Sequence, residues 1–519
     1  MKYYSFTTIV LAVIILVFFS GQSVPADEIK PDVLKDAKVP GQIAIVQHDG
    51  FNLSIEDIIG DGQVVVKMNT PCHNYWGANF INLPIDAELK IGLSMDFNAN
   101  QDNVADVKKW HCLVPVFSYA NPINAASYEW YKKGSDGRWK SGNPLIPKSS
   151  MYVGNGLLPI QSVISPALAN QFLTDGGTTW IPWKNVDATE ANDELNIFRV
   201  VQKFTMCSAT LAMRIPYVNA VADDCVAQIH KFKPKGVDVC TIGKSAAGRD
   251  LNVVILRNTM ESDKQKLLEK PTIVLYAEDG NEHDANWTCY GCLRFLLSDD
   301  VDAANVRKKL NILLLPAFDP DGMANSTWAN ITKSFLLSKV NDKLPVETIA
   351  YTRFFDSWIA QGNRLDIVCG LHNVESAETT ANILCPIIDQ RRKAAMTAMN
   401  NYILDHITDY KTSHDIWMYG FLDRRLCGWC NKHFGSICCT YETNSQASAQ
   451  KLNLMNLQGL GKSLIESIAS YTNTDDYTKL KTEIDGIRTR HLSRQKAYWA
   501  TQKKKEKEHS VYESVSLAF

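Results

Sequence analysis

The sequence lacks an excess of charge of either sign, and this balance argues against one class of partner. Its 54 Lys and Arg residues nearly match 56 Asp and Glu residues, which gives a formal net charge of −2. Proteins that bind nucleic acids usually carry a basic surface rich in Arg and Lys, so we expect no nucleic-acid partner. The 519 residues contain no internal repeat, and beyond the N-terminus no stretch is apolar enough to predict a transmembrane helix.

Cysteine is not scarce, but its spacing does not match a metal-binding zinc ribbon. Two pairs, Cys289/Cys292 and Cys427/Cys430, have the required two-residue spacing, yet more than a hundred residues separate them. The pairs of a zinc ribbon lie only about 15–20 residues apart. Disulfides or buried thiols therefore explain the thirteen cysteines better, and an odd count leaves at least one unpaired. The sequence does not reveal the disulfide pairing.

The N-terminus predicts export. Lys2 precedes an apolar run over residues 9–19, and the small-residue pattern Val24-Pro25-Ala26 follows. The run is too short to cross a bilayer easily, and its flanks match a secretory signal peptide over residues 1–26 that is cleaved after Ala26. The alternative is an uncleaved anchor. With cleavage, we expect a secreted or periplasmic protein that is not stably inserted in a membrane.

The length requires more than one domain. In the first part, strand-like runs are separated by Gly, Asn, Asp and Pro turns, and in residues 89–97 apolar and polar side chains alternate with the period of two that is typical of a half-buried strand. We predict an antiparallel β-sandwich domain over residues 27–217. Its expected strands are residues 63–68, 89–97, 114–119, 127–131 and 198–212.

From residue 218 the pattern changes, because strand-like and helical runs alternate. The predicted strands are residues 252–256, 272–276, 311–315, 366–369 and 436–441, and predicted helices include residues 346–359 and 390–407. This alternation is typical of an α/β domain with a largely parallel mixed sheet, here over residues 218–474. Residues 475–519 are polar and predict a partly helical, solvated C-terminal tail, with partner binding as the alternative.

One stretch of the second domain is rich in groups that can carry chemistry. Residues 272–276 form a β-branched apolar run, and a helical pattern begins near Trp287. The turn between them contains Glu278, Asp279, Glu282, His283 and Asp284. Because open α/β sheets bind ligands at the carboxyl ends of their strands, we expect a functional site in this turn.

Five short segments in this order resemble the zinc carboxypeptidase family (the carboxypeptidase A-like funnelins). They are residues 242–251, 279–282, 314–322, 369–373 and 439–442. The Asp-Ala-Asn-Trp sequence at 284–287 and the Ile-Pro-Tyr sequence at 215–217 resemble the cytosolic-carboxypeptidase branch, whose members have a β-sandwich ahead of the catalytic domain. The resemblance covers roughly residues 70 to 470.

The resemblance implies a zinc site and a catalytic carboxylate. It makes Glu282 and His372 metal ligands and Glu442 the general base and acid, while Asp279 stands where the family has its first His ligand. Zinc accepts Asp oxygen, although two carboxylates make the site more anionic and should weaken its Lewis acidity. His283 is a less favoured substitute ligand, since it more simply packs at the start of the helix.

The substrate-binding residues of the family are only partly matched. No Arg follows the Asp-Pro-Asp-Gly turn at 319–322, and the family's Asn-Arg pair reads Asn341-Asp342. Tyr419 lies at about the spacing of the family's active-site Tyr. Losing a bidentate Arg removes carboxylate recognition. Other arginines that can supply the charge are Arg353, Arg364, Arg424 and Arg425.

These residues favour an exported, zinc-dependent metallocarboxypeptidase-like hydrolase of peptide or amide bonds. An esterase using the same site is not distinguishable from it. The alternative is a catalytically impaired pseudo-carboxypeptidase that binds a peptide or glycan, in which Asp279, Glu282, His372 and Glu442 have only structural roles. Export argues against tubulin tails, the substrates associated with the cytosolic branch, as substrates of this protein. The sequence reveals neither the natural substrate nor the oligomeric state.

Overall fold

The computed structural model describes most of the second half of the chain and short segments of the first half. The described segments of the second half are residues 216–257, 263–298, 300–327, 344–373, 381–385, 390–406, 412–418, 425–443 and 454–516. The predicted signal peptide at 1–26 lies outside the described residues. Among the helices that are described, none combines the length and the apolarity needed to cross a bilayer.

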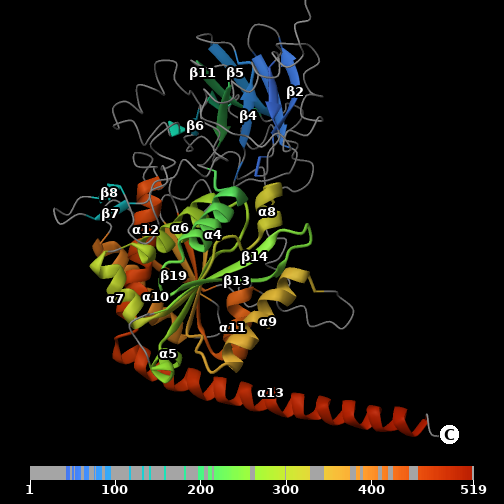
Figure 1. Cartoon of the computed structure of the whole chain (residues 1–519). Helices are drawn as coiled ribbons and strands as arrows, with labels where there is room; N and C mark the ends of the chain where they lie inside the picture. Colours follow the sequence, from blue (N-terminus) through green and yellow to red (C-terminus); the bar gives the residue numbers. More distant parts are fainter. Residues whose placement is uncertain are drawn as a thin grey trace, which may run out of the picture.

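An eight-stranded mixed sheet forms the centre of the second half (Figure 1). Its strand order is β13 (Val237–Lys244), β14 (Asp250–Leu256), β16 (Asn311–Leu315), β15 (Thr272–Ala277), β17 (Ile367–Asn373), β20 (Ile437–Thr443), β18 (Ala381–Cys385) and β19 (Thr412–Met418). The four middle strands, from β16 to β20, are mutually parallel. The α/β prediction is therefore confirmed, while β13, β18 and β19 were not among the predicted strands.

Helices cover both faces of this sheet, and the middle strands are buried on both sides. Alternate residues of β15 enter different cores: Ile273 and Leu275 pack in one, and Val274 and Tyr276 in the other. The first core includes residues of α4 (Asn219–Phe232), α6 (His283–Leu297), α7 (Val301–Lys309), α10 (Gln390–His406) and α12 (Leu454–Tyr471). The second core includes residues of α9 (Val346–Ala360) and α11 (Leu426–Phe434). Burial on both faces explains why β15 and β16 are continuous apolar runs.

Helix α6 is buried along its whole length and packs closely on α12. A Cβ atom at Gly461 of α12 would lie 2.1 Å from the carbonyl oxygen of Thr288, so only glycine permits this approach. The Cys292 thiol donates to the Gly461 carbonyl oxygen at 3.0 Å. This contact fixes the middle of α6 against α12.

Nine described cysteines are free thiols, and all but Cys240 are buried. They are Cys225, Cys240, Cys289, Cys292, Cys369, Cys427, Cys430, Cys438 and Cys439. Of the two explanations left open by the sequence, buried thiols hold for eight of these nine, and disulfides are wrong for all nine. The eight buried cysteines are part of the apolar cores on both faces of the sheet.

The described strands of the first half form two five-stranded sheets and a separate two-stranded ribbon. One sheet has the order β1 (Ala44–Val46), β4 (Gly77–Ile81), β12 (Ser208–Ala212), β6 (Val116–Ser118) and β9 (Leu157–Leu158). The other has the order β10 (Ile181–Pro182), β11 (Ile197–Lys203), β5 (Glu88–Ser94), β3 (Gln63–Met68) and β2 (Leu53–Ile59). The ribbon pairs β7 (Tyr131–Lys133) with β8 (Trp139–Ser141).

Two details of the first half differ from the predictions. The single strand expected over residues 198–212 is two strands, β11 and β12, which belong to different sheets. The expectation of purely antiparallel pairing is wrong for β3 and β5, which pair in parallel. Contact with the second half includes the backbone bond from Gly50 to Ala324, at 2.8 Å, near the end of α8 (Pro320–Asn325).

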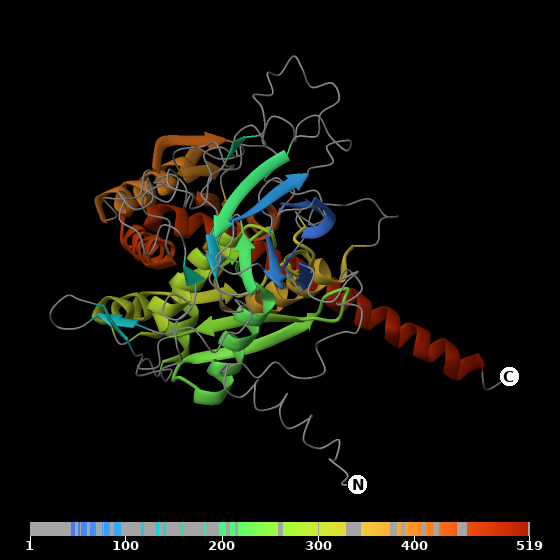
Figure 2. The same cartoon turned by 90° about the horizontal axis from the view of Figure 1, so that it is seen from above.

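The C-terminal segment is a single helix, α13 (Asp475–Ser516), which projects away from the body of the molecule (Figures 1 and 2). Its first turns are not solvated as predicted, because Tyr477 and Ile484 are buried in the core. The Tyr477 hydroxyl donates to an Asp366 carboxylate oxygen at 3.0 Å. The beginning of α13 is therefore part of the domain.

Candidate metal centre

Two neighbouring parallel strands bring the predicted ligands to one edge of the sheet. Asp279 follows β15, Glu282 precedes the first residue of α6, and His372 is the penultimate residue of β17. The turn after β15 is held to β17 by a bond from the Glu278 amide to the Leu371 carbonyl oxygen, at 3.0 Å. Carboxyl ends of adjacent parallel strands meet at the same edge, which explains the convergence of residues far apart in sequence.

The turn also requires a glycine. A Cβ atom at Gly280 would lie 2.2 Å from the backbone nitrogen of Met323 in α8. No side chain fits in that space, so Gly280 lets the turn pack directly against α8. This packing holds Asp279 and Glu282, which flank the turn, in their relative positions.

Asp279, Glu282 and His372 are buried and offer ligand atoms that all lie within 4.8 Å of one another. His372 Nδ1 is 2.8 Å from Glu282 Oε2 and 3.2 Å from Asp279 Oδ2. Tetrahedral zinc with bonds of about 2.0–2.2 Å separates its ligand atoms by roughly 3.4 Å. The oxygen, oxygen and nitrogen donors therefore suit a zinc ion, and the three residues that the family resemblance named lie together.

Backbone and side-chain bonds orient these groups. The Asn373 amide donates to Glu282 Oε2 at 3.0 Å, and the Asn373 side-chain oxygen accepts from the Ala285 amide at 2.9 Å. Thr443 of β20 donates through its hydroxyl to the His372 carbonyl oxygen at 2.7 Å. The end of β17 is thus fixed to both α6 and β20.

A third acidic residue and an arginine meet the opposite side of the imidazole. Glu278 Oε2 lies 2.6 Å from His372 Nε2 and 2.9 Å from Arg425 Nη1. Arg425 Nη1 also lies 2.6 Å from His372 Nε2. In the sequence, Glu278 is one of the acidic residues of the turn and Arg425 one of four candidate arginines, and no motif links either to His372. The one sequence signal for a role of Glu278 at the metal centre is its position next to Asp279.

The crowded charges shift the pKa values of these groups. Burial alone lowers the pKa of His372. The charge of Glu282 and the hydrogen bonds of His372 with Asp279 and Glu278 outweigh this effect and raise the pKa well above its usual value. Burial raises the pKa of Glu282, and Asp279 adds to this effect. Burial opposes the charge of Arg425, yet Glu278 and Asp279 hold the pKa of its guanidinium above the usual value. Negative charge thus dominates around the imidazole, as a cation site requires.

Glu442 lies on β20 directly beside His372. The two residues are register partners on adjacent parallel strands, so their side chains leave the same face of the sheet. Glu442 is only half-buried, whereas His372 is 3% exposed. This position can place a carboxylate between the buried ligands and the surface.

The remaining predicted residues divide into three groups. His283 packs rather than ligates, as favoured, because its Nδ1 accepts from the Tyr217 amide at 2.9 Å. Arg364 pairs with Asp366 at the opposite end of β17, and Arg353 is exposed on α9. The predicted substrate-binding residues Asn341, Tyr419 and Arg424 lie outside the described residues.

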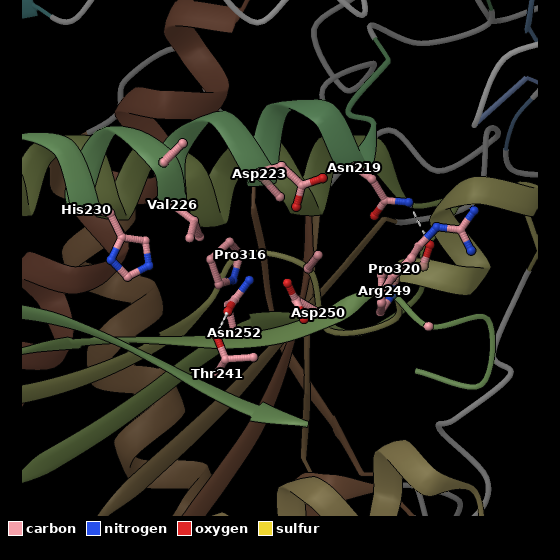
Figure 3. A pocket seen from close by; sticks show the side chains of 14 residues that line it. Asn219, Asp223, Val226, His230, Thr241, Arg249, Asp250, Asn252, Pro316 and Pro320 are labelled. Carbon is pink, nitrogen blue, oxygen red and sulfur yellow. Dashed lines mark hydrogen bonds between the residues drawn. The ribbon is translucent and has the colours of Figure 1, made fainter. Parts of the chain in front are cut away.

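A separate surface groove of about 510 Å³ lies between α4 and the β13–β14 hairpin (Figure 3). Two side chains on its border are fixed by hydrogen bonds: Asn219 donates to the Pro320 carbonyl oxygen at 2.8 Å, and Thr241 donates to Asn252 at 2.7 Å. None of the metal-centre residues lines this groove. It is therefore distinct from the metal centre.

Known proteins are similar to this chain in sequence pattern and in fold. A family model described as zinc carboxypeptidase matches residues 223–509. A metallo-carboxypeptidase structure from Burkholderia cenocepacia is 12% identical, with a TM-score of 0.58, covering 83% of this chain and 99% of that one. A Pseudomonas aeruginosa metallo-carboxypeptidase in complex with (2-guanidinoethylmercapto)succinic acid is also 12% identical, with a TM-score of 0.57, covering 83% of this chain and 98% of that one. No curated protein matches the chain.

Proposed function

Because this chain belongs to the zinc carboxypeptidase family, we propose that it is a zinc-dependent hydrolase of peptide or amide bonds. The family model covers more than half of the chain, residues 223–509 of 519. The observation that carries the proposal is the convergence of Asp279, Glu282 and His372 in one buried cluster. A metallopeptidase of this family acts on peptides, so the substrate is a peptide or a related amide.

In this proposal Asp279, Glu282 and His372 hold the metal through one atom each. Three protein ligands are the number found in catalytic zinc sites. A bound zinc ion supplies a Lewis acid that polarises a carbonyl and makes water more acidic. The donor set is one nitrogen and two anionic oxygens, so this effect should be weaker than in a site with two imidazoles.

Glu442 moves the proton in the proposed reaction. Its carboxylate takes a proton from the attacking water and passes it to the leaving nitrogen as the C–N bond breaks. Two features support this role: its register position beside His372 and its partial exposure. Its partial exposure lets a bound substrate and a water molecule come within hydrogen-bond reach of the carboxylate.

The substrate need not carry an ordinary free C-terminus. No Arg follows the Asp-Pro-Asp-Gly turn, and Asp342 stands where the family has the Arg of its Asn-Arg pair. Arg425 is near the centre but is engaged by Glu278 at 2.9 Å. We therefore propose substrates whose recognition does not depend on a bidentate guanidinium–carboxylate pair.

The cellular setting is a further part of the proposal. The apolar run at 9–19 supports a signal peptide and a secreted or periplasmic location. The two five-stranded sheets support a β-sandwich ahead of the catalytic domain, as in the cytosolic-carboxypeptidase branch. Structural matches that cover 83% of the chain also extend beyond the residues of the family match.

One observation favours a second candidate function, a pseudo-carboxypeptidase that binds a peptide or glycan. Arg425 Nη1 lies 2.6 Å from His372 Nε2, so a protein cation already lies beside the ligand cluster. With Asp279 in place of a His, the cluster could serve as a buried ion-pair network. This candidate predicts metal well below one ion per chain and ligand binding that chelators do not change.

Metal analysis followed by activity measurement separates the two candidates. When it is purified in the absence of chelators, the hydrolase should contain about one zinc ion per chain. It should also cleave blocked peptide amides. Glu442→Gln should retain the metal and lose about 10²–10⁴-fold in rate. Asp250→Asn, which changes an exposed acidic residue outside the centre, is the control and should match the wild type. A metal-loaded wild type without amidase or esterase activity would contradict the hydrolase.

A further inference from the structure

The His372 imidazole is held between two sets of acidic groups that act on different nitrogens. Nδ1 faces Glu282 and Asp279, at 2.8 and 3.2 Å, whereas Nε2 faces Glu278 at 2.6 Å. A neutral imidazole has one donor and one acceptor nitrogen. Which nitrogen carries the hydrogen therefore decides whether His372 can ligate a metal at Nδ1.

Glu278 favours the tautomer that can ligate. A carboxylate accepts hydrogen bonds only, so Glu278 Oε2 stabilises the hydrogen on Nε2 and leaves the Nδ1 lone pair directed at Asp279 and Glu282. Histidine ligands commonly donate their second ring N–H to a carboxylate, which also fixes the ring orientation. The 2.6 Å contact provides this interaction from a residue adjacent to the first predicted ligand.

Arg425 fixes Glu278 in turn. Its Nη1 donates to Glu278 Oε2 at 2.9 Å, and its side chain is only 13% exposed. The same Nη1 lies 2.6 Å from His372 Nε2. Both nitrogens can only donate when Nε2 carries its hydrogen, so this contact must widen while both donate to Glu278. Space for the Glu278 carboxylate depends on Gly370 of β17, where a Cβ atom would lie 3.2 Å from Glu278 Oε2. The pair therefore connects the turn after β15, which contains Glu278, with the start of α11, which Arg425 precedes, and it packs against β17.

Acidic groups outnumber basic ones around His372. Glu278, Asp279 and Glu282 bring three carboxyl groups and Arg425 one guanidinium, which favours a cation at the ligand atoms. A neutral His in place of Asp279 would lower the negative charge by one. Arg425 supplies the extra positive charge that an Asp ligand demands.

We propose that Glu278 and Arg425 form a positioning pair, which orients His372 for metal binding and offsets the charge of the Asp279 ligand. Neither residue touches the metal or the substrate in this assignment. The inference rests on the metal centre of the proposed function. It predicts that metal affinity and ligand geometry depend on a carboxylate and an arginine outside the three ligands.

The test is titration of the metal-free full chain with Zn²⁺ and Co²⁺, in which the visible spectrum of bound Co²⁺ reports ligand geometry. Glu278→Gln should weaken metal affinity about 10–100-fold and alter the Co²⁺ spectrum. Arg425→Met should act in the same direction, while Arg425→Lys, which keeps the charge, should restore most of the affinity. Asp321→Asn is the matched control, since Asp321 forms a 2.9 Å pair with Arg249 outside the centre.

A variant that fails to fold is identified by thermal unfolding in the presence of chelator. Gly370→Ala then provides a second test, because its Cβ atom crowds Glu278 Oε2 at 3.2 Å, together with Tyr276 Oη at 3.1 Å, without changing any charge. It should weaken affinity in the same direction. Wild-type affinity and spectrum in folded Glu278→Gln, or tighter binding in Arg425→Met, would overturn the positioning pair alone. A wild type that takes up neither metal would overturn the proposed function together with it.

Discussion

The two ends of strand β17 each hold a buried carboxylate beside an arginine, but their surroundings differ. At the start of the strand, Asp366 accepts hydrogen bonds from the Thr272 amide, the Arg364 guanidinium and the Tyr477 hydroxyl. Arg364 also pairs with Asp485. At the end of the strand, three carboxylates surround His372, and Arg425 is the arginine that the described residues place there.

The difference is one of charge balance. Among the described residues, Arg364 and Arg488 face Asp366 and Asp485 at the start, so the charges cancel and the hydrogen bonds are satisfied. At the end, three carboxylates face the Arg425 guanidinium and the His372 imidazole, so they outnumber the basic groups even when the imidazole is protonated. Burying unbalanced charge is costly unless a partner offsets it. We infer that the first cluster serves stability and the second serves cation binding.

The largest expected effect is the loss of metal on changing a ligand. Glu282→Gln replaces an anionic oxygen by a neutral amide, which is a poor zinc ligand. Metal content should fall from one ion per chain to background, as measured by metal analysis of the purified variant. Asp366→Asn, at the other end of β17, should retain the metal whenever it is folded. Equal metal loss in both variants would remove the distinction between the two ends.

The second effect concerns stability and should be seen at the start of the strand. Asp366→Asn leaves Arg364, which is 2% exposed, without its main counter-charge. Breaking a buried ion pair from one side costs about 3–5 kcal/mol. Denaturant unfolding of the metal-free proteins should show this loss in Asp366→Asn and a much smaller one in Glu282→Gln. The reverse order would mean that the ligand cluster is the structural one.

The sequence predicted much of this arrangement, because the informative signals were local. The strand Asn311–Leu315 was predicted with the observed bounds, since a short apolar run between polar turns is typical of a buried parallel strand. The convergence of Asp279, Glu282 and His372 followed from their positions at strand ends and from the family resemblance. Both signals lie within a few residues of the groups they predict.

Features that depend on long-range packing were not predictable. Arg425 and Glu278 are separated by 147 residues, and no periodicity links them. The start of α13 looked solvated because its sequence is polar, yet Tyr477 and Ile484 are buried against the domain. Strands β18 and β19 lie at the edge of the sheet beside β20, and neither was expected. In each case the partner is distant in sequence, so local composition carries no signal.

A third effect is stabilisation of the folded state by bound metal, which should require the ligands at the C-terminal end of β17. A ligand at a free concentration of 100 times its dissociation constant stabilises the folded state by about 2.7 kcal/mol. Zinc should therefore raise the melting temperature of the wild type and of Tyr477→Phe, but not that of Glu282→Gln. A zinc-dependent shift in Glu282→Gln would show that the ion binds elsewhere.

The smallest effect measures how firmly α13 belongs to the domain. Tyr477→Phe removes the hydroxyl that donates to Asp366, and a hydrogen bond to a charged group contributes about 1.5–3 kcal/mol. The loss should be near the lower limit, because Thr272 and Arg364 still donate to Asp366. Tyr471→Phe is the control: this buried ring lies 6.0 Å from Tyr477, and its hydroxyl has no hydrogen-bond partner among the described residues. If denaturant unfolding shows equal losses for both variants, the bond to Asp366 contributes nothing, and α13 is held by apolar packing alone.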